Sequence, residues 1–327
     1  MQDHPTRFSA ETLAIDADAE IERLAAWLRE QLRVSVRRRG LVLGLSGGID
    51  SSVCAGLAAR AVGPRNVFCL FMPQSDSDPE SLRLGRLVAE TFGLESVVED
   101  IAPALAAVGC YERRDGFIRQ VEPAYGAGWS SKIVIDGPLV TGGYNVSSLV
   151  VRDPDGETRK HRLPAPVYQG IVAATNMKQR TRKQLEYYHA DRLNYAVVGT
   201  PNRLEYDQGF FVKNGDGAAD IKPIAHLYKS QVYQLAERLG VPEEVRRRPP
   251  TTDTYSLPQT QEEFYFALPY DKMDLCLHGL DHALPVREVA YACGLGEEQV
   301  ERVWTDIAAK RKAARYLHLP PLLCGAL

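Results

Sequence analysis

The sequence predicts an α/β protein with a doubly wound parallel sheet, and three observations support this prediction. Short, almost continuously apolar runs are typical of strands buried on both faces, and they alternate with stretches of helical periodicity. This alternation is the pattern of a parallel sheet with helices on both sides. It also resumes after a long interruption in the middle of the chain. The expected strands are residues 41–45, 67–72, 96–101 and 195–199, and the expected helices are residues 18–37, 51–62, 79–92, 168–189, 229–239, 285–293 and 297–315.

The first helix is predicted from one apolar stripe. Ile21, Leu24 and Leu28 recur at the three- and four-residue spacing of a single helix face. The basic run 37–39 and then Gly40 end it, since cations and glycine favour the last turn and the stop of a helix. The helices that follow the predicted strands share this kind of periodicity. The two predicted after residue 280 make the C-terminus helical.

The interruption covers residues 109–166, which we interpret as an insertion within a single domain spanning 1–327. It is rich in glycine, proline and β-branched residues. The Asp-Pro-Asp-Gly sequence at 153–156 is a strong turn signal. Because the stretches 147–152 and 157–163 on either side read as strands, the insertion is predicted to contain a β-hairpin.

Composition excludes several classes of protein. The chain is 45% hydrophobic and 25% charged, with a net charge of -3, so nothing indicates a nucleic-acid or membrane-surface binder. Six scattered cysteines without a Cys-x-x-Cys pair argue against a disulfide framework or zinc site and favour a reducing cytoplasm. No signal-peptide pattern begins the sequence. No apolar run approaches the roughly 18 residues of a membrane span. We therefore expect a cytoplasmic protein.

The strongest chemical feature is the sequence GLSGGIDSS at residues 44–52, between a predicted strand and helix. Its glycines let the backbone approach a ligand closely, and amide groups at a helix start attract phosphate. Ser46, Ser51 and Ser52 add hydroxyl groups. No lysine follows the glycines, so this is not the P-loop motif. The alternative is a tight turn without a ligand, but the serines and Asp50 favour a phosphate site.

This loop resembles the signature of the ATP pyrophosphatases, which split ATP into AMP and pyrophosphate. Among them the chain resembles the NAD synthetases, over roughly residues 18–105 and 168–275. The resemblance implies an adenine nucleotide α-hydrolase-like fold and the ATP-dependent amidation of deamido-NAD to NAD through an acyl-adenylate. The matching segments are Asn-x-x-x-Arg-x-Arg at 176–182, Gly-Thr-x-Asn-x-x-Glu at 199–205, the glycine-rich 209–217 followed by Asp220, and Lys229 with Pro249-Pro250-Thr251.

The resemblance also implies a role for individual residues. A carboxylate is a poor electrophile, so it must be adenylated, and cations must neutralise the two anions that approach each other. Asp50 and Glu205 are the implied magnesium ligands, and Asp50 and Lys229 the catalytic residues. The implied ATP-binding residues are Gly44, Leu45, Ser46, Gly47, Gly48, Ile49, Asp50, Ser51, Ser52, Thr200, Lys229 and Thr251, and those for the dinucleotide substrate are Asn176, Arg180, Lys213 and Asp220.

Three departures from the family pattern fall on the substrate side. Val172 stands where many members have an aromatic residue, Ala309-Lys310-Arg311 replaces a His-Lys-Arg run, and the 109–166 insertion is additional. One alternative is therefore an adenylating amide ligase for a different carboxylate. Another is a non-catalytic nucleotide-binding subunit. The residues leave Lys178 open as either a phosphate ligand or a solvated charge.

The family resemblance extends to partners. It implies a homodimer with the site near the subunit interface, and ammonia as the nitrogen donor, because glutamine-using relatives carry an additional glutaminase domain. A separate glutaminase partner is the alternative ammonia source. For the insertion we hypothesise a flap or a dimer-facing element over the substrate.

Overall fold

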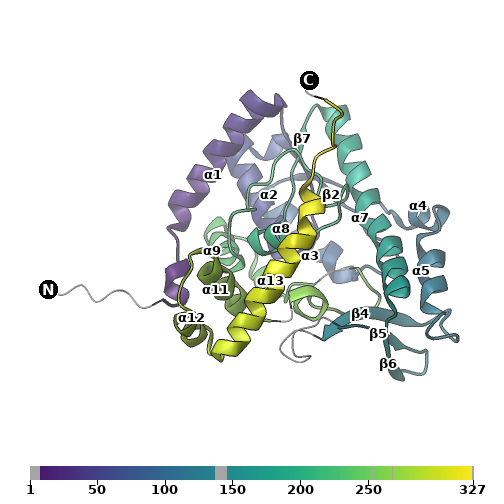
Figure 1. Cartoon of the computed structure of the whole chain (residues 1–327). Helices are drawn as coiled ribbons and strands as arrows, with labels where there is room; N and C mark the ends of the chain where they lie inside the picture. The colour runs from purple at the N-terminus through teal and green to yellow at the C-terminus, as the bar shows by residue number, and fades with distance from the viewer. Residues whose placement is uncertain (1–7, 137–145, 252–253, 267, 326–327) are drawn as a thin grey trace.

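The computed structural model describes residues 8–136, 146–251, 254–266 and 268–325. Its centre is a parallel sheet with strand order β3-β2-β1-β7. Figure 1 labels β2 and β7 of this sheet between the surrounding helices. A parallel bridge between Val198 and Ile221 continues the sheet beyond β7. The four predicted strands are confirmed, each within a few residues. Their bounds are Leu41–Gly44 for β1, Val67–Phe71 for β2, Glu95–Val98 for β3 and Ala196–Val197 for β7.

Helices cover both faces of this sheet, which confirms the doubly wound prediction. Alternate strand residues point to opposite sides, so Leu41 and Leu43 pack on one face and Val42 on the other. The first face is covered by α1, α2, α3 and α9, and the second by α4, α5 and α7. Their bounds are Ala17–Gln31 for α1, Ile49–Val62 for α2, Pro79–Phe92 for α3, Ala102–Ala107 for α4, Cys110–Ile118 for α5, Ala165–Leu193 for α7 and Lys229–Leu239 for α9.

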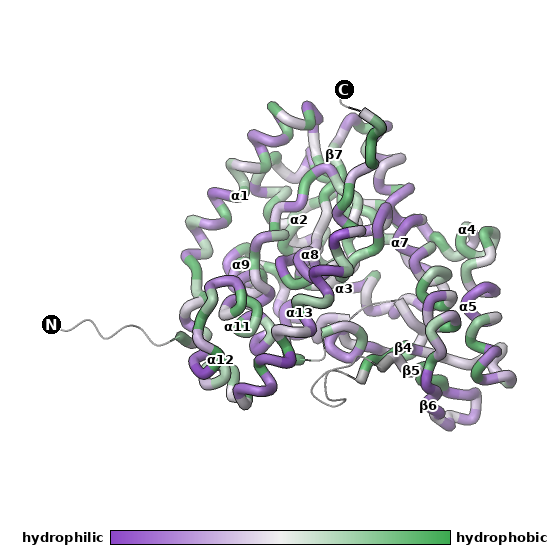
Figure 2. The backbone as a smooth tube through the Cα atoms, in the orientation of Figure 1, coloured by the Kyte–Doolittle hydropathy of each residue, from purple (hydrophilic) through white to green (hydrophobic). Residues whose placement is uncertain are grey.

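Hydropathy follows this layering. The tube in Figure 2 is hydrophobic along much of α2, whose residues are buried over most of its length. It is hydrophilic along β6, Thr158–Arg162, where the strand is mostly exposed. The hydropathy of the residues therefore agrees with the burial of α2 and with the exposure of β6.

The insertion holds more structure than the sequence predicted. The β5–β6 hairpin is confirmed, with β5 spanning Val146–Arg152. A third antiparallel strand, β4 at Ser130–Asp136, pairs with β5 and was not predicted. The helix α5 inside the insertion and the helix α4 just before it were also missed. Both are short, and α4 has proline in its first turn, so neither gives a long periodic pattern.

The C-terminal helices form a separate core. The predicted helices at 285–293 and 297–315 are confirmed as α12, Val286–Cys293, and α13, Glu297–His318. They pack with α11, which was not predicted. None of the helices in the described part of the chain combines the length and the hydrophobicity that crossing a membrane requires. The remaining elements are α8 at Arg203–Gln208, α10 at Glu243–Arg247, α11 at Tyr270–Asp281, 3-10 turns at Ala10–Leu13 and Pro64–Asn66, and π-helical turns at Leu32–Val36 and Glu262–Phe266.

This topology creates a crevice. After β1 the chain moves outward through β2 and β3, and it returns across the opposite face to place β7 on the other side of β1. Ligands of open α/β sheets bind where the strand order reverses, beyond the carboxyl ends of the strands. The loop after β1, at residues 44–52, lies at this position.

Candidate active site

A cleft of about 670 Å³ opens at the carboxyl ends of β1, β2 and β7. The loop after β1 contributes Gly44, Ser46 and Asp50 to its lining, and the chain after β7 contributes Thr200 and Glu205. The cleft therefore occupies the crevice where the sheet topology predicts a ligand.

The loop after β1 has the form of an anion-binding turn. The hydroxyl groups of Ser46 and Ser51 lie 3.1 Å apart, and Ser46 Oγ accepts a 3.3 Å hydrogen bond from the Gly48 amide. Gly48 precedes the first turn of α2 and provides no side-chain cap. The amide groups at the start of a helix carry partial positive charge, so this end of the cleft attracts negative groups.

Gly47 is required by the packing behind this loop. Its φ is +72°, and a Cβ there would stand 2.6 Å from the Ser81 carbonyl oxygen in α3. Gly47 and Ser52 are the two residues of the predicted loop that do not line the cleft. Ser52 is fully buried and donates to the Gly48 carbonyl at 2.8 Å. These two residues therefore shape the loop from behind.

A buried lysine between two carboxylates lies beside the loop. Lys229, at the start of α9, is fully buried and its ammonium group contacts Asp50 Oδ2. Asn202 donates from Nδ2 to Asp50 Oδ1 at 3.1 Å, and its backbone amide donates to Glu205 Oε2 at 3.1 Å. Gln261 donates to the other oxygen of Glu205 at 3.2 Å. The structure thus brings together three residues that are distant in sequence.

Burial and mutual repulsion set the electrostatics of this cluster. Burial, followed by the negative charge of Asp50, raises the pKa of Glu205 to about 8, against the attraction of Lys229. Burial alone would lower the pKa of Lys229, but the two carboxylates outweigh burial and hold that pKa above its ordinary value. The cluster therefore favours the charged form of Lys229 and disfavours the charged form of Glu205.

One stripe of α7 forms another wall of the cleft and was largely missed by the sequence analysis. Asn176, Gln179, Lys183 and Glu186 follow each other at three- and four-residue spacing, and all four line the cleft. Lys183 and Glu186 are buried and form an ion pair of 2.5 Å. The periodicity from Asn176 onward was the signal that would have identified them.

The other predicted residues fall into two groups. Thr200 and Thr251 line the cleft, whereas Lys229 stands behind Asp50. Arg180, Lys213 and Asp220 do not line it in this chain.

Arg180 and Lys213 lie instead next to each other near the end of α13. Arg180 donates to the Lys213 carbonyl at 3.2 Å, and Lys213 Nζ donates to the carbonyls of Tyr316 and Leu319 at 2.9 and 3.2 Å. Asp220 accepts a 2.8 Å bond from the Val197 amide, beside β7. The predicted role of these three residues in substrate binding stays a prediction.

Lys178 is neither of the two things that the sequence left open. Its side chain is buried, and its ammonium group donates to Asp76 Oδ2 and to the Thr254 carbonyl, each at 2.6 Å. It neither faces solvent nor lines the cleft. Lys178 is therefore part of a buried polar network at the edge of the site.

The sequence matches the model of the NAD synthase family over residues 20–117 and 159–315. The chain belongs to the NAD synthase family. The matched residues leave out 118–158, which fall inside the predicted insertion. The recognition made from the loop and its accompanying segments is confirmed.

Curated relatives carry the same family name. An NH(3)-dependent NAD(+) synthetase of Rhizobium meliloti is 74% identical over 97% of this chain and 94% of its own. One from Mesorhizobium japonicum is 60% identical over 95% of this chain and 98% of its own. One from Thermotoga neapolitana is 36% identical over 80% of this chain and 83% of its own. The alignment with the Rhizobium meliloti relative covers 316 residues of this chain, so it includes most of residues 109–166.

Solved structures confirm the fold of the family. The NH3-dependent NAD synthetase of Campylobacter jejuni matches with a TM-score of 0.61 at 23% identity, over 95% of this chain and 100% of that chain. An NMN synthetase from Francisella tularensis matches with a TM-score of 0.65 at 22% identity, over 95% and 99%. The predicted α/β fold with its parallel sheet is thus confirmed.

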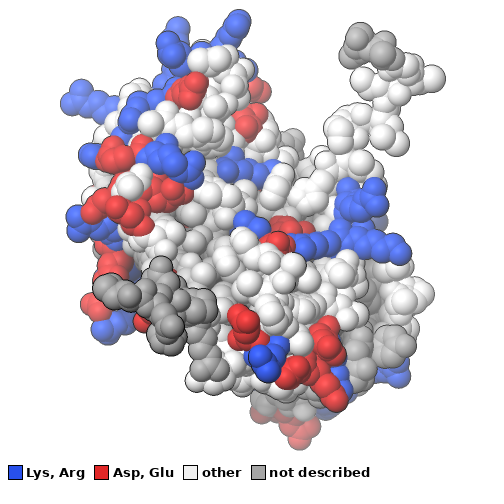
Figure 3. All heavy atoms as spheres, turned by 60° about the vertical axis from the view of Figure 1, so that its left-hand side comes forward, with Lys and Arg blue, Asp and Glu red and all other residues white. Residues whose placement is uncertain are grey.

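Charge on the surface agrees with the composition. On the face drawn in Figure 3, basic side chains occur in small groups with acidic neighbours and with wide uncharged areas between them. Positive charge at the cleft comes from Arg182, Lys183 and Arg248, which line it. The buried Lys229 lies behind Asp50.

Proposed function

We propose that this protein converts deamido-NAD to NAD, using ATP to adenylate the carboxylate and ammonia to displace AMP, with release of pyrophosphate. The observation that carries the proposal is the buried Lys229–Asp50–Glu205 cluster beside a phosphate-binding loop, in a chain of the NAD synthase family. The curated relatives named NH(3)-dependent NAD(+) synthetase support the reaction and the nitrogen donor.

The chain's own residues account for the first step. The serine hydroxyls and the helix start hold the polyphosphate, and Lys229 offsets negative charge as pyrophosphate departs. The substrate carboxylate oxygen attacks the α-phosphorus, the bond to pyrophosphate breaks, and an acyl-adenylate forms. Ammonia then attacks the acyl carbon, AMP leaves with the electron pair, and the nitrogen loses a proton. No side-chain nucleophile is needed, so most of the rate comes from positioning and charge.

Asp50 and Glu205 fit a magnesium ion. Both are oxygen ligands that line one cleft, and magnesium is usually held by one or two carboxylates together with substrate phosphates. Burial and the charge of Asp50 raise the pKa of Glu205, and a divalent ion would favour its charged form. When bound, the ion would neutralise the phosphates and favour the departure of pyrophosphate.

The substrate side is consistent with a flat aromatic group. Val172 lines the cleft where the family pattern has an aromatic residue, and Tyr168 and Phe264 line it as well. Aromatic surface is therefore present although it comes from other positions. The alternative of a different carboxylate is kept because Val172 lines this part of the cleft and the insertion packs against Val172 from behind.

We also propose a cytoplasmic homodimer that uses free ammonia. Arg180 and Lys213 lie outside the cleft of a single chain. A second copy placed near the end of α13 would bring a ligand bound at the interface within reach of these two side chains. Light scattering of the purified protein tests this point. A monomer across the micromolar range would contradict it.

The decisive experiment mixes the protein with ATP, magnesium, ammonium and deamido-NAD and measures NAD and AMP by chromatography. Equal amounts of the two products are expected. A panel of other carboxylates, scored by substrate-dependent pyrophosphate release, separates this function from a related amide ligase. Binding of ATP without any AMP formation would favour a non-catalytic subunit.

A further inference from the structure

The first strand of the insertion lies against a segment that lines the cleft. We call residues 254–266 the cleft segment, because Thr254, Gln261 and Phe264 are among its lining residues. The Ser131 amide in β4 donates to Ser256 Oγ at 2.9 Å. The Ser131 carbonyl accepts from the Leu257 amide at 3.2 Å. The outer edge of β4 is therefore occupied by the cleft segment.

Side chains extend this contact along the strand. Lys132 Nζ donates to the Pro258 carbonyl at 3.0 Å and to Glu263 Oε2 at 2.9 Å. Gln259 is buried and donates to the Ile133 carbonyl. These bonds tie the middle of the cleft segment to three successive residues of β4.

An apolar contact adds to these bonds. Tyr255 is buried in one cluster with Ile118 of α5, Ile133 of β4 and Leu149 of β5. Tyr255 also lines the cleft. One side chain of the cleft segment is thus shared between the core of the insertion and the wall of the site.

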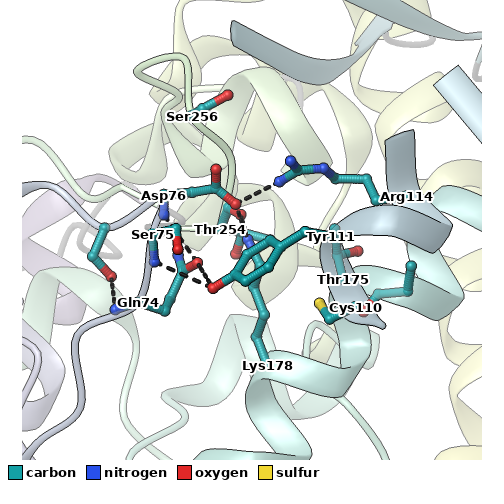
Figure 4. Close-up of polar contacts among 12 residues, drawn as sticks. Gln74, Ser75, Asp76, Cys110, Tyr111, Arg114, Thr175, Lys178, Thr254 and Ser256 are labelled. Atoms are coloured by element: carbon teal, nitrogen blue, oxygen red, sulfur yellow. Dashed lines mark hydrogen bonds and ion pairs between the residues drawn. The ribbon is translucent and has the colours of Figure 1, made fainter. Parts of the chain in front are cut away.

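A buried polar network fixes the start of the cleft segment (Figure 4). Asp76 lies in the loop after β2 and accepts from Lys178 at 2.6 Å and from Arg114 of α5 at 2.5 Å. Lys178 also holds the Thr254 carbonyl at 2.6 Å. All three side chains of the ion cluster are at most 9% exposed. The connection between α5 and Thr254 therefore runs through two ions, Asp76 and Lys178, whose side chains are largely buried.

Tyr111 of α5 joins the same network. Its hydroxyl group accepts from the Ser75 amide at 3.2 Å and donates to Gln74 Oε1 at 3.2 Å, as Figure 4 shows. Gln74 lines the cleft. The helix α5 consequently fixes two cleft walls, the loop after β2 directly and the cleft segment through Lys178.

The other end of the cleft segment reaches the carboxylate pair. Gln261 donates to Glu205 at 3.2 Å and accepts from the Tyr270 hydroxyl. The segment thus spans from the insertion to a proposed magnesium ligand. Ordering such a segment costs conformational entropy, and a ligand that must order it binds more weakly.

We propose that the insertion, from α5 to β4, is a scaffold that pre-orders the cleft segment for nucleotide binding, with Arg114, Tyr111 and Ser131 as positioning residues. This role differs from the flap or dimer-facing element over the substrate that the sequence suggested, which stays a prediction. It rests on the proposed function only in that the nucleotide is ATP. Residues far from the nucleotide then control the affinity for the nucleotide. The groups that act in the chemical step are unchanged.

The test measures binding of a non-hydrolysable ATP analogue with magnesium by calorimetry, together with steady-state kinetics. Arg114→Met removes one cation from Asp76, and we expect the dissociation constant and the KM for ATP to rise about tenfold. The kcat should stay within about twofold, because no contact with the reacting groups is lost. Arg113→Met, on the exposed side of the same helix, is the matched control. It should change neither the dissociation constant nor the KM for ATP.

Two gentler variants keep the test valid if Arg114→Met does not fold. Tyr111→Phe and Ser256→Ala each remove hydroxyl hydrogen bonds and leave the apolar packing in place. Each should raise the dissociation constant about threefold and speed amide hydrogen exchange in residues 254–266. Arg114→Lys should restore part of the affinity that Arg114→Met loses.

The outcomes separate the two claims. Wild-type protein that binds no nucleotide would refute the proposed function. Wild-type protein that binds, with all three variants binding as tightly and exchanging as slowly, would refute the scaffold alone. A fall in kcat with unchanged analogue binding would also refute it, because pre-ordering acts on binding.

Discussion

The two ends of the cleft each hold a fully buried lysine, and the two lysines differ in what surrounds them. Lys229 faces two carboxylates, Asp50 and Glu205, and its pKa is raised above its ordinary value. Lys178 shares the carboxylate of Asp76 with Arg114, and burial, to which the positive charge of Arg114 adds, lowers its pKa. The nucleotide end therefore has carboxylate in excess. At the insertion end Asp115 also accepts from Arg114, at 2.8 Å, so two carboxylates balance the two cations.

This difference separates binding from support. A pair of carboxylates with one lysine is short of positive charge, so it favours a further cation and the phosphates that accompany it. At the other end the ammonium, guanidinium and carboxylate groups already satisfy one another. Four predictions follow from the contrast, beginning with the largest effect.

Replacing Lys229 by methionine should abolish most of the activity. The change leaves Asp50 without its buried counter-ion beside the proposed phosphate site, and we expect kcat to fall about 10³-fold. Pyrophosphate release at saturating ATP and ammonium measures it. Lys178→Met is the matched substitution at the other end and should keep kcat within about threefold. Equal losses of kcat in both variants would remove the distinction between the two ends.

Replacing Lys178 by methionine should instead reduce stability. Breaking a buried ion pair typically costs about 3–5 kcal/mol, and Arg114 still pairs with Asp76, so we expect a loss of about 2 kcal/mol. Urea denaturation followed by circular dichroism measures the free energy of unfolding. A variant as stable as wild type would show that the network at Asp76 adds nothing to the folded state.

Replacing Glu205 by glutamine tests whether this carboxylate is a magnesium ligand. Glutamine can keep the reciprocal cap with Asn202 at the start of α8 but cannot supply a charged ligand. We expect the magnesium concentration for half-maximal activity to rise about tenfold, while thermal stability is retained. Glu301→Gln on the exposed face of α13 is the control. An unchanged magnesium requirement would exclude Glu205 as a ligand.

Asp281, a carboxylate near the surface, provides a comparison for the energetic effect of these buried ion pairs. Burial opposes ionisation of Asp281, but hydrogen bonds from Arg311 and Arg203 outweigh it and lower its pKa below 3.8. A carboxyl group whose pKa is lower in the folded than in the unfolded protein stabilises the fold when the pH is above the unfolded-state pKa. This stabilisation is lost as the pH falls through the folded-state pKa. Asp281→Asn should thus cost about 1 kcal/mol at neutral pH, because solvent screens the pair.

Thermal melts of wild type and Asp281→Asn across acidic pH check this sign. Their difference should be constant above about pH 5 and shrink below pH 3.8, where the unfolded carboxyl is already protonated. A difference that grows as the pH falls would mean that Asp281 is destabilising in its ionised form.

The sequence predicted the sheet and the loop because both are local patterns. The strands are continuous apolar runs, and GLSGGIDSS occupies nine adjacent positions at 44–52. The helix α9 was predicted with the bounds it has, because its apolar periodicity is strong and Gly240 ends it. Local signals of this kind do not depend on the rest of the chain.

The network at Asp76 was not predictable in the same way. Asp76 and Lys178 are 102 residues apart, and nothing near either one indicates a partner. The strand β4 pairs with β5 on one side, but its outer neighbour is the cleft segment, more than a hundred residues later in the chain, and no local pattern indicates that contact. Lys229 and Asp50 are 179 residues apart, and only the family resemblance suggested that they share a site.

Asn202 has one last consequence for the site. Its side-chain amide donates to Asp50, at the beginning of α2, and its side-chain oxygen accepts from the Glu205 amide at 3.2 Å, at the beginning of α8. A single planar group therefore fixes the spacing between the starts of two helices. A displacement of either helix start would therefore be transmitted through Asn202 to the other, which keeps Asp50 and Glu205 in register.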